Sequence, residues 1–166
     1  VTMKLDSYVY LQGTVTFNKG AAVDVTLSGG GAKQPMNLMT IGASNVSGFV
    51  GTGFSGFKTD GKPNDEAMGL YLANVSFGLA LLQGSAANAS YYGLQATVGA
   101  AGFQGVTGVA LSATDLTVVV NGGASAAVVN FSAATDWDGA GSGTAVTSGL
   151  AIAGSGGQVL NFAGQQ

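Results

Sequence analysis

The stretch GLYLANVSFGLALL, residues 69–82, places the tightest limit on what this chain can fold into. It carries no charge and is apolar at most positions. A membrane-spanning helix needs about 20 apolar residues, and this run is shorter and is interrupted by polar residues and glycines. A buried helix is disfavoured by Tyr71, Val75 and Phe77, which prefer strands, and by the interior Gly78. We therefore expect a β-strand.

With a period of two, this strand has one wholly apolar face and one mixed face. The apolar face is predicted to be the core face and consists of Tyr71, Ala73, Val75, Phe77, Leu79 and Leu81. The mixed face is small at its centre, at Ser76, Gly78 and Ala80, so another layer can approach it closely. That layer belongs either to this chain or to a neighbouring subunit. Coverage on both sides predicts a central strand.

The rest of the chain repeats this alternation between turn signals. Residues 1–17 and 21–27 are predicted to form a long hairpin around a turn at 18–20. Further strands are expected at 90–98, 116–120 and 126–134, and two short strands at 149–164, with a turn at 121–123 and loops at 57–67 and 135–149. No helical stripe is present. The prediction is an all-β fold with an antiparallel sheet, sandwich-like or an elongated roll, able to continue between units.

Composition narrows the function classes. The chain of 166 residues has no Cys, His or Arg, and 8% of its residues are charged, against about 25% in an average domain. Five lysines cannot form a phosphate-binding stripe, so nucleic acid is not an expected partner. Without His or Cys, and without a carboxylate pair in a context that perturbs a pKa, we expect no enzyme. No linker divides residues 1–166, which predicts a single all-β module.

Two acidic loops are candidate Ca²⁺ sites. One holds Asp60, Asp65 and Glu66, and the other holds Asp136 and Asp138 beside several glycines. Ca²⁺ prefers about six to eight oxygen ligands, and neither loop has the complete spacing of a known calcium loop. The competing interpretation of both is a solvated loop. Ca²⁺ is the one cofactor that the sequence suggests.

Three aromatic residues are candidate contacts for a glycan or a partner. Trp137 is the one tryptophan and lies in a predicted loop, while Tyr91 and Tyr92 point to opposite faces of a predicted strand. Such rings stack on sugars or fill partner pockets. The alternative for each is packing within the chain.

Four segments carry a resemblance to a known family. Residues 41–51, 67–82, 90–98 and 108–121, in this order and spacing, are similar to a recurring unit of very large, Gly- and Ala-rich secreted bacterial surface proteins of the haemolysin or calcium-binding type. In that family the segment after one unit resembles residues 1–20 of this chain. The resemblance implies one period of a longer repeat protein, a bacterial extracellular or cell-surface location and an adhesin-like or matrix-like role. It supplies no catalytic residues.

The leading hypothesis is a structural subunit or repeat of an extracellular bacterial fibre, adhesin, or surface or biofilm-matrix assembly. It would associate with copies of itself or with neighbouring repeats through strand pairing and sheet packing, without membrane insertion. The predicted interface lies at residues 1–17 and 159–163 and includes Val9, Leu11, Val15, Phe17, Val159, Leu160 and Phe162. The alternative is a Ca²⁺-dependent or polysaccharide-binding adhesion module that uses Trp137 and the loop of Asp136 and Asp138.

Overall fold

The computed structural model describes residues 2–5, 8–109 except 86–88, 111–123, 126–139 and 143–166. The predicted all-β fold is confirmed. The large sheet contains β1 (Thr2–Leu5), β2 (Val9–Val25), β3 (Gln34–Thr52), β4 (Met68–Gly84), β5 (Ser90–Gln104) and β6 (Ser112–Gly123), and the small sheet contains β7 (Leu150–Ala151) and β8 (Val159–Leu160). Over the described residues, no helix has the length and apolar character needed to cross a membrane.

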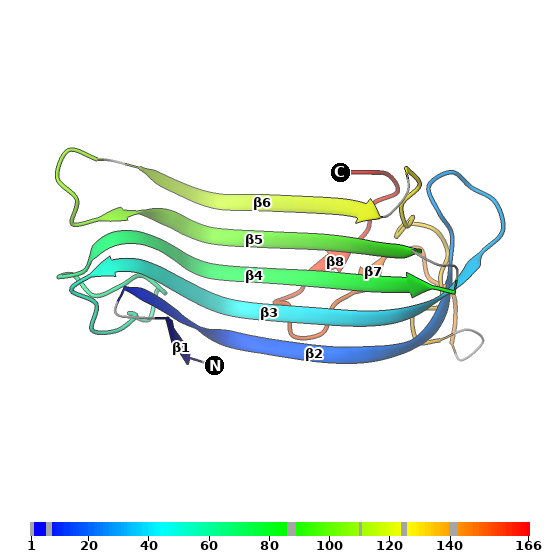
Figure 1. Ribbon diagram of the computed structural model, residues 1–166, viewed down its shortest axis with the longest axis horizontal. Coiled ribbons are helices and arrows are strands. Elements are labelled where there is room, and N and C mark those ends of the chain that lie inside the picture. Colours follow the sequence, from blue (N-terminus) through cyan, green and yellow to red (C-terminus); the bar gives the residue numbers. More distant parts are fainter. Residues whose placement is uncertain (1, 6–7, 86–88, 110, 124–125, 140–142) are drawn as a thin grey trace.

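The large sheet is a simple antiparallel meander. Its strands lie in the order of the sequence, from β1 to β6, and each pairs with the next (Figure 1). Residues 69–82 fall within β4, between β3 and β5. The prediction of a central strand for this stretch is confirmed.

Two predicted turns are wrong. Residues 18–20 lie inside the continuous strand β2, which runs beside β3, and a shift of register between Lys19 and Ala22 accommodates the extra residues as a bulge. Residues 121–123 lie inside β6. The buried Asn121 side chain donates hydrogen bonds of 2.9 Å to the carbonyl oxygens of Val129 and Gly164, which hold it at the end of this strand.

Residues 126–139 and 143–166 form a second layer, called here the C-terminal layer, across one face of the sheet (Figure 1). Its two short strands pair Leu150 with Leu160. Hydrogen bonds tie it to the sheet: the Asn130 amide donates to the Thr26 carbonyl at 2.8 Å, and Gln158 Nε2 donates to Thr97 Oγ1 at 3.1 Å.

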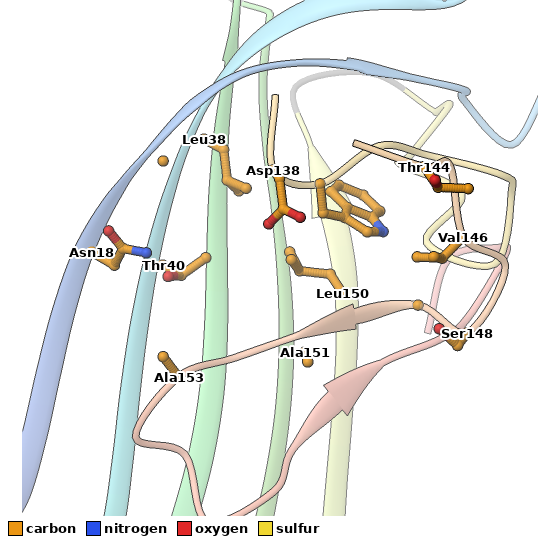
Figure 2. A pocket seen from close by; sticks show the side chains of 13 residues that line it. Asn18, Leu38, Thr40, Asp138, Thr144, Val146, Ser148, Leu150, Ala151 and Ala153 are labelled. Carbon is orange, nitrogen blue, oxygen red and sulfur yellow. The ribbon is translucent and has the colours of Figure 1, made fainter. Parts of the chain in front are cut away.

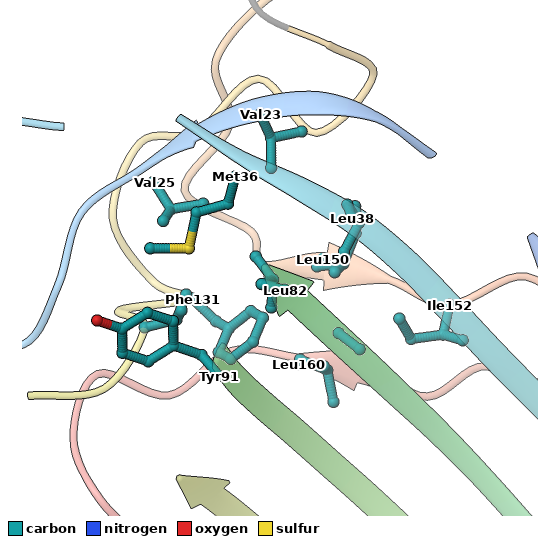
Figure 3. Packing of buried hydrophobic residues seen from close by; sticks show 12 residues of the cluster. Val23, Val25, Met36, Leu38, Leu82, Tyr91, Phe131, Leu150, Ile152 and Leu160 are labelled. Atoms are coloured by element: carbon teal, nitrogen blue, oxygen red, sulfur yellow. The ribbon is translucent and has the colours of Figure 1, made fainter. Parts of the chain in front are cut away.

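The main hydrophobic core lies between this layer and the sheet (Figure 3). Side chains from both layers enter it, namely Val23, Val25, Met36, Leu38, Ala80, Leu82, Tyr91, Val129, Phe131, Leu150, Ile152 and Leu160. The rings of Trp137 and Phe162 pack against it, both in contact with Phe131. The core therefore depends on the last quarter of the chain.

The sheet presents very small residues where the C-terminal layer approaches most closely. A Cβ atom at Gly42 would collide with the Ala153 carbonyl oxygen, and one at Gly78 would lie 2.8 Å from Ile152 Cγ1. Both glycines are paired with each other across β3 and β4. The close layer that the small centre of residues 69–82 predicts thus belongs to this chain.

Near one end of the sheet, β3 to β6 bend together (Figure 1). A row of left-handed residues lies beside the paired residues Val46, Val75, Val98 and Leu116. Asn45 in β3, Asn74 in β4 and Asp115 in β6 have φ angles of 51°, 55° and 55°. Asn and Asp adopt this conformation more readily than other residues with a side chain. Shifts of register between β3 and β4 coincide with Asn45 and Asn74, so these two positions are bulges, whereas β5 and β6 stay in register past Asp115.

The predicted core face of residues 69–82 is wrong at Val75, Phe77, Leu79 and Leu81, because the C-terminal layer packs against the small residues on the opposite side of β4. The left-handed row separates these four residues from Tyr71 and Ala73, which do lie on the covered side. On β2, Leu11 and Val15 alternate regularly and point to the same side of the sheet. Their partners on β3 are Gly48 and Ala43, which pair in turn with Leu72 and Phe77 of β4. Leu72 therefore faces the same side as Phe77, and the alternation of β4 reverses at Asn74. The covered side of β4 carries the small residues, the buried Ala73 and Leu82, and Tyr71, whereas the other large apolar side chains of β4 share the opposite side.

Residues 53–67, which connect β3 to β4, cover the other end of the same face. Phe49 is buried there and Phe54 stacks on it with ring centroids 5.3 Å apart. Asn74 Nδ2 donates to the Asp60 carbonyl at 3.0 Å, and Gln104 Nε2 donates to the Asn64 carbonyl at 2.6 Å. We call this side of the sheet the covered face and the opposite side the open face.

Candidate functional site

The open face is the most unusual surface of the molecule. Six rows of directly paired residues build it across five strands. From the bent end inward, the rows are Val9, Val50, Leu70 and Phe103; Leu11, Gly48, Leu72, Ala101 and Ala113; Val46, Val75, Val98 and Leu116; Val15, Ala43, Phe77, Ala96 and Val118; Phe17, Ile41, Leu79, Leu94 and Val120; and Lys19, Met39, Leu81, Tyr92 and Gly122.

Large apolar side chains of these rows are exposed to solvent. Phe17 is 71% exposed, Val118 47% and Leu72 41%, and most other large exposed hydrophobics of the chain share this face. Isolated exposed hydrophobics are ordinary on a soluble protein, whereas a contiguous patch indicates a contact surface. The arrangement is therefore suited to binding another apolar surface.

Charge is nearly absent from the open face. Lys19, on the outer strand β2, is the one charged residue in the six rows. Polar residues lie beyond the last row, where Asn37 pairs with Gln83 and Gln83 with Ser90. A hollow of about 460 Å³ lies there, bordered by Lys19, Met39, Leu81 and Tyr92 among others. The face thus has an apolar centre and a polar rim at one end, the usual anatomy of an interface.

The predicted interface residues separate into two groups. Val9, Leu11, Val15 and Phe17 all lie on the open face, on β2. In contrast, Leu160 is fully buried in the core, and the Phe162 ring packs edge-on against Phe131 at 5.2 Å between centroids. Val159 pairs with Ala151 in the small sheet. Val159, Leu160 and Phe162 therefore belong to the C-terminal layer, and the Leu160 side chain is unavailable to a partner.

The three aromatic candidates also differ. Trp137 stacks on Phe131, with centroids 5.7 Å apart and planes 20° apart, and its Nε1 is buried without a hydrogen-bond partner among the described residues. Tyr91 lies in the core, whereas its neighbour Tyr92 is exposed on the open face. Trp137 thus packs within the chain, against Phe131. It also borders a cavity of about 300 Å³ together with Asn18, Thr40 and Asp138 (Figure 2).

In the first acidic loop, the carboxylates have hydrogen-bond partners within the chain. Asp65 accepts a 2.7 Å hydrogen bond from Lys58, which holds the pKa of Asp65 below its ordinary value and raises that of Lys58. A hydrogen bond from Asn64 likewise lowers the pKa of Glu66. Asp60 Oδ1 accepts from the Lys62 amide at 3.1 Å. These side chains act as local braces of the loop over the covered face.

In the second loop, Asp136 accepts hydrogen bonds from the amides of Gly143 at 2.9 Å and Asp138 at 3.3 Å. The described residues contain no cluster of three or more His, Cys, Asp or Glu that could hold a metal ion. The geometry thus assigns Asp136 a role in shaping the turn. The calcium site stays a prediction.

Sequence reasoning missed the centre of the open face, notably Phe77, Leu79 and Val118. The signal was present, since these strands are apolar at positions of both parities, which is unusual in a sheet that faces water on one side. Comparisons of the chain with family models, with curated proteins and with solved structures give no match.

Proposed function

We propose that the chain is a structural module of an extracellular bacterial fibre, adhesin or surface assembly, and that it works by associating with other modules. The observation that carries this proposal is the open face: one side of the sheet is covered by the chain itself, and the other is apolar and exposed. Such a face lowers the free energy of the system when another surface covers it.

Strand pairing is a second route to association. Over the described residues, β6 pairs only with β5, and β1 covers β2 only as far as Gln12. The backbone groups of β6 and those of β2 from Thr14 onward can pair with another sheet. Asp115 is the one charged residue of β6, so little electrostatic repulsion opposes an approaching strand.

The proposed extracellular location is supported by the sequence rather than by the open face. The resemblance of residues 41–51, 67–82, 90–98 and 108–121 to a unit of secreted bacterial surface proteins points to a matrix or adhesive setting. The low content of charge and the absence of cysteine suit a module that packs closely against its neighbours.

The test is the state of association of the purified chain. We expect light scattering to show a mass that rises with concentration, and electron microscopy to reveal defined assemblies. Hydrogen exchange of the β6 amides should slow in the assembled state if the edges take part. A strictly monomeric species at every concentration, with all these amides exchanging equally fast, would contradict the proposal.

A second candidate function is a glycan-binding or Ca²⁺-dependent adhesion module. The cavity beside Trp137 favours it, because an aromatic ring, the Asp138 carboxylate and the polar side chains of Asn18 and Thr40 meet there. Trp137 is the only tryptophan, so its fluorescence reports on this site alone. A shift of emission on adding Ca²⁺ or a soluble bacterial polysaccharide would support this function, and unchanged emission and melting temperature with both would remove it.

A further inference from the structure

The open face is large enough to form a stable interface by itself. Strands β2 to β6 each contain at least 12 residues. With about 4.8 Å between strands and about 3.3 Å per residue, they present a face of about 950 Å². The largest apolar patch on a typical monomer is about 300–600 Å², and a stable complex buries about 800 Å² on each partner. One partner of similar size and flatness would cover it.

The chemistry of the face favours an identical partner. Its six rows contain no carboxylate and a single charged residue, Lys19, so they offer nothing with which to select a partner by charge. Two copies placed face to face bring no like charges together at the centre. Lys19 lies on the outer strand, from which its aliphatic stem can follow the apolar surface while the ammonium reaches water.

The arrangement of large and small side chains on the open face is also self-complementary. Phe77, at the middle of the central strand β4, is paired directly with Ala43 on one side and Ala96 on the other. A large ring therefore stands between two low positions. A two-fold axis near the centre of the face would set the Phe77 ring of each copy above a low position of the other, which is the reciprocal contact of an isologous interface.

We infer that the open face binds the open face of a second copy of this chain. The two sheets would pack about 10 Å apart, with strands nearly aligned, and each copy would contribute the same residues. This inference rests on the proposed function and names its partner, and it assigns the dimer contact to sheet packing rather than to strand edges.

The first test compares two adjacent residues of β6 that are both exposed and point to opposite faces. Val118 lies on the open face, whereas Thr117 pairs with Thr97 on the covered face. We expect Val118→Asp to weaken dimerisation by at least ~100-fold in sedimentation velocity across a dilution series, because a carboxylate would be buried without a partner. Thr117→Asp should leave the dimer unchanged. Far-ultraviolet circular dichroism checks that both variants are folded.

The second test keeps the native apolar surface. The chain has no cysteine, so Ala96→Cys introduces a single thiol next to Phe77 at the centre of the face. A short bifunctional thiol reagent should convert this variant to covalent dimers at a concentration where the wild type is dimeric. Thr117→Cys, whose thiol lies on the other face, should form no covalent dimer under the same treatment.

The outcomes separate this inference from the proposed function. Large assemblies whose formation is unaffected by Val118→Asp, and in which Ala96→Cys does not crosslink, would overturn face pairing and leave edge association standing. A monomer at every concentration would overturn both. A monomer that cosediments with phosphatidylcholine vesicles, and loses this binding on Val118→Asp, would also overturn pairing and assign the face to lipid.

Discussion

On the covered face of β4, Gly78 lies against Ile152 and the buried Leu82 enters the core, whereas Leu72 on the open face of the same strand is 41% exposed. Both faces avoid charge. The two faces differ in side-chain size. The small residues of the covered face let a second layer of backbone approach closely, whereas the large residues of the open face have no such layer over them. In this sheet, the more apolar face is therefore not the one that the chain buries.

The largest contrast is expected between two phenylalanines. Phe131 is fully buried, stacks on Trp137 and contacts Phe162, whereas Phe103 on the open face is 40% exposed. Phe131→Ala should lower the free energy of unfolding by about 3–5 kcal/mol, since it leaves a cavity in the core. Phe103→Ala should cost about 1 kcal/mol in the monomer. Urea denaturation at low protein concentration measures both, and equal losses would refute the distinction between the faces.

The next contrast uses two glycines of β3. Gly42→Ala would drive a methyl group into the Ala153 carbonyl oxygen, a contact with backbone that cannot swing away. It should cost about 2–3 kcal/mol of stability. At Gly48, the nearest atom to a new Cβ is Leu11 Cδ2 at 3.1 Å, the end of a flexible side chain. Gly48→Ala should therefore change stability by less than about 1 kcal/mol. Thermal melting of the two variants gives the order, and the reverse order would place the C-terminal layer elsewhere.

A smaller effect is expected at the bend. Asp115 has a φ of 55° and is exposed, so its backbone conformation dominates its contribution. Asp115→Val should cost about 1–2 kcal/mol, because a β-branched residue resists the left-handed conformation, whereas Asp115→Gly should be neutral or slightly stabilising. Thr117→Val, two residues away and also exposed, serves as the control for β-branching. If both valines behave alike, the left-handed row does not determine the bend.

The sequence predicts the all-β class, the central position of β4 and the close layer over its small residues, because alternation and side-chain size are local properties. It does not predict which face is covered. That outcome depends on the C-terminal layer, which packs against the small residues of β4 through contacts far apart in the sequence. Asn74 adds a second difference, because its left-handed conformation reverses the alternation of β4 and looks like any other polar interruption in the sequence. The turn expected at residues 18–20 failed for a related reason, since pairing with β3 converts the turn signal into a bulge.

The sequence predicts only part of the open face. Val9, Leu11, Val15 and Phe17 alternate regularly because the reversal on β2 falls after Lys19, so the sequence predicts correctly that these four residues share one face. The remaining strands each pass through the bend, which hides the common face of Leu72 and Phe77. The expected glycan contact at Trp137 competes with core packing on Phe131, a contact between residues that sequence patterns do not connect.

The smallest expected effect concerns the loop that closes the bent end of the covered face. Because the hydrogen bond from Lys58 lowers the pKa of Asp65 in the folded state, its contribution to stability is present above the unfolded value of about 3.9 and is lost as pH falls through the folded pKa. Asp65→Asn should therefore lower the melting temperature slightly near neutral pH, and its difference from the wild type should vanish in acid. The pair is exposed and screened by solvent, so the loss is small. Asp24→Asn makes the same change of charge on β2, and an equal loss there would mean that net charge, rather than the brace across this loop, sets the effect.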